Sequence, residues 1–88
     1  MMLRYDQAAD AAYVSVSDPI LEGEVRRSED VNRGDQYERG IDYDSEGRVL
    51  GYEFLNVSRG LDLSGLPHRE ELAALFERVL GLRVLETT

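Results

Sequence analysis

One stretch of this chain has the spacing of an amphipathic helix, and it follows a longer region that alternates like β-strands. Apolar side chains recur at the i, i+3, i+4, i+7 and i+8 positions of one helical face, at Leu72, Leu75, Phe76, Val79 and Leu80. Pro67 suits a first helical turn, and Gly81 suits the position just past a helix end. We therefore predict a helix over residues 67–80, which must pack its apolar face on another element.

The region before this helix predicts that other element, an antiparallel sheet of four to five strands. Residues 1–57 contain short runs rich in Tyr, Val, Ile and Leu that alternate with a period of two, broken by Gly, Asp, Asn and Pro. The helix should rest on the face that carries Leu50, Tyr52 and Phe54, which gives one α+β domain over residues 1–88. The expected strands are residues 2–6, 11–17, 24–32 (a charged edge strand), 41–44 and 48–57, with a polar loop at 33–39.

The residues between the last two strands support two readings. A tight reversal at residues 44–47 predicts a β-hairpin turn, because Gly47 can adopt a positive φ without a Cβ clash. Residues 42–53 also match a twelve-position calcium loop, with acidic residues at positions one, three and five and Glu53 at position twelve. That motif needs a helix on each side, whereas the outgoing flank alternates like a strand. The hairpin is therefore predicted, and a calcium loop is the less favoured alternative.

The chain is poor in the side chains that usually carry catalysis. It has no cysteine, which excludes thiolate zinc sites, cysteine nucleophiles and disulfides. His68 is its single histidine, and no Ser, Thr or carboxylate is placed beside it by sequence. We predict that His68 is an exposed residue of the first helical turn. The sequence thus predicts no catalytic residue, no cofactor-binding residue and no metal ligand, and favours a protein that is not an enzyme.

The charge of the chain limits its partners and its location. Eighteen acidic residues against ten basic ones give a formal net charge of −8, which repels the phosphate backbone of nucleic acids. No apolar run approaches the roughly 20 residues needed to cross a bilayer, and the first residues lack the apolar segment of a signal peptide. We therefore expect a cytoplasmic protein that binds neither nucleic acid nor membrane.

Several short segments of the first sixty residues form a recognisable combination: Arg4-Tyr5-Asp6, Ala9-Asp10-Ala11, Tyr13-Val14, Ile41 to Asp44, Glu46 to Leu55 and Ser58-Arg59. In this combination the chain resembles the domain of unknown function 2283 family. The resemblance implies a small, mostly prokaryotic protein built as a compact sheet, with a hairpin turn at residues 44–47. It implies no activity, cofactor or catalytic residue. Some similar small proteins appear beside toxin-like genes, so the resemblance also implies an antitoxin role as an alternative.

These observations favour an interaction or assembly module, with an antitoxin-like protein that neutralises a basic partner as the alternative. We also expect a homo-oligomer, most simply a two-fold dimer, because one helix of about 14 residues covers only part of such a sheet. The uncovered face would carry Val49, Leu55 and Val57. Residues 82–85 could form a further short strand or a packed tail, and a tail folded across that face would keep the chain monomeric.

Overall fold

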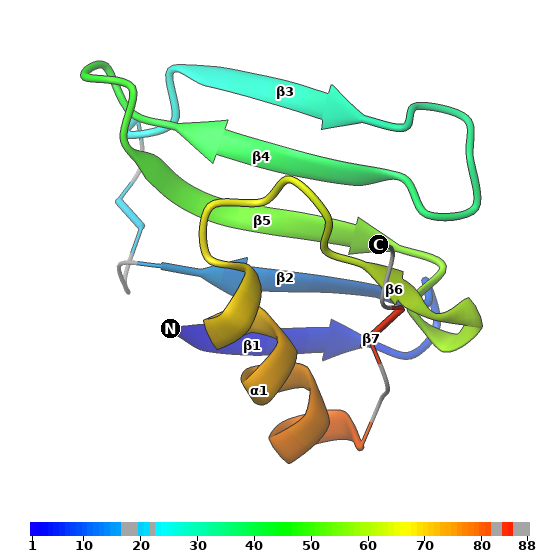
Figure 1. Ribbon diagram of the computed structural model, residues 1–88. Coiled ribbons are helices and arrows are strands. Elements are labelled where there is room, and N and C mark those ends of the chain that lie inside the picture. The colour runs from blue at the N-terminus through cyan, green and yellow to red at the C-terminus, as the bar shows by residue number, and fades with distance from the viewer. Residues whose placement is uncertain (17–19, 22, 82–83, 86–88) are drawn as a thin grey trace.

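The computed structural model describes residues 1–16, 20–21, 23–81 and 84–85, and it confirms the α+β fold class (Figure 1). Five strands form one sheet in the order β1-β2-β5-β4-β3, and all neighbouring strands in it are antiparallel. Their bounds are β1 Met2–Asp6, β2 Ala11–Ser15, β3 Arg27–Val31, β4 Arg39–Tyr43 and β5 Val49–Leu55. The later elements are the 3-10 helix η1 Val57–Arg59, β6 Leu61–Asp62, the α-helix α1 Arg69–Leu80 and β7 Val84–Leu85.

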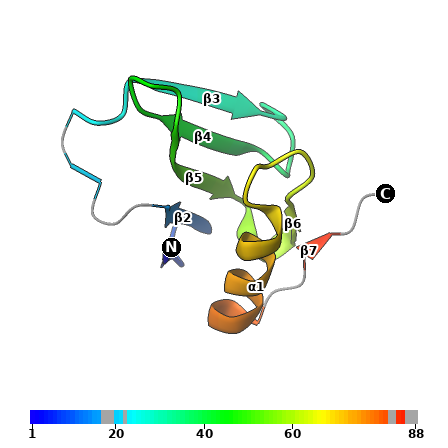
Figure 2. The ribbon, with the colours of Figure 1, turned by 60° about the vertical axis from the view of Figure 1, so that its left-hand side comes forward.

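Strand alternation places the apolar side chains of the sheet under α1, as predicted. Tyr52 of β5 lies opposite Val14 of β2 and Ile41 of β4, and all three are buried. The helix crosses this face of the sheet (Figures 1 and 2). The ring of Phe76 meets Phe54 edge-on, with 5.1 Å between the ring centroids. Burial of aromatic rings in this geometry makes the contact between α1 and β5 the centre of the core.

The segment between β5 and α1 closes the core, and this was not predicted from the sequence. Val57, Leu61, Leu63 and Leu66 are all buried there. The predicted strand over residues 48–57 starts one residue too early and ends two residues too late, because Asn56 adopts a left-handed conformation (φ 54°) and turns the chain into η1. Val57 therefore packs inside the molecule and not on a sheet face.

Two details of the predicted helix differ from the structure. The helix starts at Arg69, two residues after Pro67, and it ends as predicted at Leu80, where the left-handed conformation of Gly81 (φ 66°) caps the last turn. Val79 shares the helical stripe of Leu72 and Leu75 but is 50% exposed. Figure 1 shows the reason, since α1 crosses β1 and its last turn extends past this edge strand.

The predicted polar loop over residues 33–39 ends one residue too late, because Arg39 is the first residue of β4 and is only 5% exposed. Its guanidinium Nη1 donates to the carbonyl oxygens of Asp62 and Ser64. The Asp62 carboxylate lies 3.8 Å from the same nitrogen. Arg39 thus ties the segment that closes the core to the sheet.

The structure tests most of the remaining strand predictions, namely the charged edge strand and residues 84–85. The charged strand β3 lies at an edge of the sheet, as predicted. Of the two alternatives for residues 82–85, the strand is found at residues 84–85, which pair in parallel with β6. Residue 17, the predicted end of the second strand, and residues 82–83 lie outside the described residues. Within the described part of the chain, no helix has the length and apolar character needed to cross a membrane.

Candidate functional site

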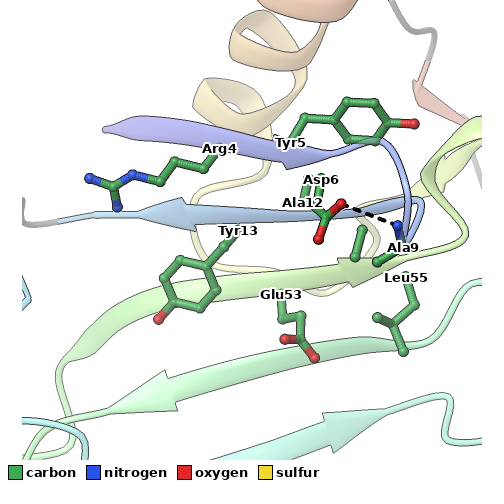
Figure 3. A pocket seen from close by; sticks show the side chains of 9 residues that line it. Arg4, Tyr5, Asp6, Ala9, Ala12, Tyr13, Glu53 and Leu55 are labelled. Carbon is green, nitrogen blue, oxygen red and sulfur yellow. Dashed lines mark hydrogen bonds between the residues drawn. The ribbon is translucent and has the colours of Figure 1, made fainter.

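The face of the five-stranded sheet opposite α1, here called the open face, is not covered by any described element (Figure 1). Strand register places Arg4 of β1, Tyr13 of β2 and Glu53 of β5 side by side across this face. Ala11 and Leu55 form the neighbouring row. Figure 3 shows Arg4, Tyr13, Glu53 and Leu55 around a depression of about 520 Å³, which Ala11 also lines. The open face therefore offers apolar and charged groups together at one accessible place.

A hydrogen-bonded network fixes the polar side chains beside this depression. The Tyr13 hydroxyl donates to one oxygen of the Asp42 carboxylate at 2.7 Å, and the Ser28 hydroxyl donates to the other at 2.6 Å. Burial, and then the hydrogen bond to Asp42, raise the pKa of Tyr13 well above its ordinary value. Tyr13 is therefore a protonated donor at neutral pH. Each Asp42 oxygen accepts one of these hydrogen bonds, so the network holds Tyr13, Asp42 and Ser28 in fixed positions.

Gly51 makes room for the Tyr13 ring on the open face. The glycine lies between Ser15 of β2 and Asp42 of β4 in the strand register. A Cβ atom at this position would be 2.6 Å from Cζ of Tyr13, closer than real carbon contacts allow. The absence of a side chain at Gly51 therefore lets the Tyr13 phenol cross β5 and reach Asp42.

The acidic residues with calcium-loop spacing have different positions and partners. Residues 44–47 form the predicted hairpin turn, with Gly47 at φ 78°. The Asp44 carboxylate accepts hydrogen bonds from the Glu46 and Arg48 amides at 2.8 and 2.9 Å, and the Arg48 amide is the main cause of its lowered pKa. In the strand register, Asp42 pairs with Gly51, not with Glu53. Among the described residues, no group of three or more His, Asp or Glu side chains is placed to hold a metal.

His68 differs from the prediction of an exposed residue, because it is half-buried against the sheet. Its Nδ1 atom lies 2.7 Å from the hydroxyl of Tyr52, a side chain with no exposed area. The two rings also meet edge-on, with centroids 5.8 Å apart. Burial raises the pKa of Tyr52. His68 sits at the N-cap of α1 and fastens the start of the helix to β5, which is a structural role.

A second polar cluster was missed by sequence reasoning, because its members are far apart in the chain. The Asp10 carboxylate accepts hydrogen bonds from the Ser58 hydroxyl at 2.6 Å, the Ser58 amide at 2.9 Å and the Tyr5 hydroxyl at 2.9 Å. The Ser58 hydroxyl is the main cause of the lowered pKa of Asp10. Asp10 and Ser58 are among the residues that carry the family resemblance, and here they join the turn between β1 and β2 to η1.

The comparisons with known proteins agree with the resemblance. A family model described as "Protein of unknown function (DUF2283)" matches residues 2–58, which include the whole five-stranded sheet and end within η1. No curated protein matches the chain, and no solved structure matches it. Since the family model covers more than half of the chain, this protein belongs to the family of proteins of unknown function DUF2283.

Proposed function

We propose that this protein is a non-enzymatic interaction module that binds a basic protein partner on the open face of its sheet. The observation that carries the proposal is the depression on this face, where Glu53 lies beside Tyr13 and Leu55 without cover from any described element. Strand register places Asp6, Asp30 and Asp42 on the same face. The depression itself is lined by two carboxylates, Asp6 and Glu53, and one arginine, Arg4, and the chain as a whole carries a net charge of −8.

The fixed geometry of the open face favours binding. Tyr13, Asp42 and Ser28 are held by hydrogen bonds across three strands, and the strands themselves are anchored by the core beneath them. A surface whose side chains are already ordered loses less conformational entropy when a partner docks. Carboxylates on such a surface would also steer a basic partner toward it and reject an acidic one.

The charge of the open face also argues against self-association through it. Two copies packed face to face would place the same excess of carboxylates against each other, which is repulsive. Two of the three apolar residues expected on this face are placed elsewhere, because Val57 is in the core and Val49 packs against the core. Of the three residues predicted for a dimer surface, Leu55 alone lines the depression on the open face. A basic partner fits this face better than a second copy does.

The antitoxin-like alternative is a special case of this proposal, because a basic toxin would meet the same acidic face. A small, strongly basic open reading frame next to the gene would favour that case. The absence of cysteine fits a module that works in a reducing cytoplasm.

The binding proposal can be tested with a fluorescently labelled arginine-rich peptide, followed by fluorescence anisotropy at low salt. Glu53→Gln should weaken binding about two- to fivefold, because it removes one exposed charge from the depression. Glu77→Gln removes the same charge from the exposed side of α1 and should leave the affinity unchanged. Equal losses for the two variants, or no loss for Glu53→Gln, would contradict binding at the open face.

A further inference from the structure

Large apolar side chains that stay exposed gather at one edge of the sheet. Among the described residues, six large apolar side chains are classed as exposed, and three of them, Met1, Met2 and Tyr5, belong to β1 or directly precede it. A fourth, Val79, lies on the last turn of α1, which extends past β1 (Figure 1). This edge adjoins the open face, because Tyr5 also lines the depression there, whereas the α1 residues of the edge do not.

The two edges of the sheet differ in how they are protected. The edge strand β3 carries three exposed charged residues, Arg27, Glu29 and Asp30, and charges of this kind discourage pairing with another strand. The edge strand β1 carries two exposed charged residues, Arg4 and Asp6, beside its exposed Met2 and Tyr5. No described strand pairs with the outer side of β1. Next to that strand, Met1 and α1 residues line a depression of about 310 Å³. A strand added beside β1 would continue the sheet under the overhanging last turn of α1 and cover Val79.

The charges around this depression are self-complementary. Glu71 and Arg78 both line it, with Ala74 between them, and they lie seven residues apart, about two helical turns. Neither side chain has an ion-pair partner among the described residues. In a two-fold pair the same patch meets itself in the reverse direction, so Glu71 of each copy would face Arg78 of the partner subunit. The small side chain of Ala74 would allow the two helices to approach closely.

We propose that a second copy of this chain docks on the β1–α1 edge, defined by β1, Met1 and the α1 residues Glu71, Ala74, Leu75, Arg78 and Val79. The two copies are related by a two-fold axis that passes near Ala74. The dimer covers Met1 and Val79, which are exposed at this edge. Its two-fold symmetry produces two ion pairs, each between Glu71 of one copy and the partner's Arg78. Met1 and the α1 residues of this edge do not line the depression on the open face, so this assembly does not rest on the proposed binding of a basic partner.

Sedimentation equilibrium of the full chain, from low micromolar to near-millimolar concentration, measures the assembly directly. The expected mass is twice the 10.0 kDa of one chain. Arg78→Glu and Glu71→Arg should each weaken the dimer about tenfold or more, because either change places like charges together at two symmetric contacts. Glu77→Arg makes the same charge change on the exposed side of α1 and should leave the dimer intact.

A mixture of the Arg78→Glu and Glu71→Arg chains gives the most specific test of the proposed ion pairs. In a heterodimer of the two, both arginines of one copy face both glutamates of the other, so the mixture should regain the affinity that each variant lost. Circular dichroism checks that both variants are folded. A 10.0 kDa mass for the unaltered chain at every concentration would overturn the proposal. The proposal would also be overturned if neither charge reversal weakened the dimer, or if the mixture regained no affinity. Dissociation of the dimer by Leu55→Glu on the open face would overturn it as well.

Discussion

The same five strands present one apolar face to α1 and one polar face to solvent. On the helix side, Val14, Tyr52 and Phe54 are fully or almost fully buried, and their neighbours across the strands are also buried. On the open face, Tyr13 and Asp42 are half-buried and are held by hydrogen bonds. The helix side therefore supplies the stability of the fold. The open face instead holds ordered polar side chains at a surface that no described element covers.

The largest expected effect is on the helix side. Phe76→Ala should lower the free energy of unfolding by about 3–5 kcal/mol, because it empties the space beside Phe54 in the centre of the core. Val79→Ala, on the same helical stripe, should cost under about 1 kcal/mol, since Val79 is half-exposed. Urea denaturation at low protein concentration measures both. Similar losses for the two variants would show that α1 is not seated on β5 as described.

A smaller effect is expected where the open face is most tightly packed. Gly51→Ala should cost about 1–3 kcal/mol, because the new methyl group would displace the Tyr13 ring from Asp42. In a Tyr13→Ala background the same substitution should instead stabilise the fold by about 0.5–1 kcal/mol, since alanine suits a strand better than glycine does. A double-mutant cycle by urea denaturation gives both values. Equal effects in the two backgrounds would refute the ring contact.

The fold should also lose stability in acid through the contacts that close the core. The Ser64 hydroxyl, more than the nearby Arg39, lowers the pKa of Asp62 below its ordinary value. A carboxyl group with a lowered pKa stabilises the fold above its unfolded-state pKa, and this stabilisation is lost as the pH falls through the folded-state pKa. Urea midpoints should therefore decrease below about pH 4, and they should decrease less in Asp62→Asn. An unchanged acid dependence in that variant would argue against this role of Asp62.

The smallest effect on stability is expected at the proposed binding surface. Glu53→Gln should change the free energy of unfolding by no more than about 0.5 kcal/mol, because Glu53 is exposed and its carboxylate has no ion-pair partner among the described residues. Thermal denaturation measures the change. A loss of several kcal/mol would show that Glu53 stabilises the fold, and would contradict the claim that stability comes from the helix side of the sheet.

Sequence periodicity predicted the features of this fold that depend on neighbouring residues. The alternation of Leu50, Tyr52 and Phe54, the turn at Gly47 and the helix stop at Gly81 are local patterns, and the structure confirms them. The burial of Arg39 could not be predicted in this way, because the carbonyl groups that accept hydrogen bonds from its Nη1 atom belong to Asp62 and Ser64.

The same limit applies to the candidate site and to the end of the helix. Tyr13 and Asp42 are 29 residues apart, and no local pattern predicts their hydrogen bond. Asp10 and Ser58, which are 48 residues apart, each look like an ordinary turn residue in the sequence. Val79 fits the helical stripe, and its exposure depends on where the sheet ends beneath α1. Register and edge positions are tertiary properties that periodicity alone does not fix.

The assignment of binding to the open face is tested most directly by methyl-resolved NMR during a titration with the arginine-rich peptide. The methyl signals of Ala11 and Leu55 report on the open face, and those of Leu72 and Val79 report on α1. We predict that the peptide shifts the Ala11 and Leu55 signals, that Glu53→Gln reduces these shifts, and that the Leu72 and Val79 signals do not move. Shifts that are largest at Val79 or Leu72 would contradict binding at the open face.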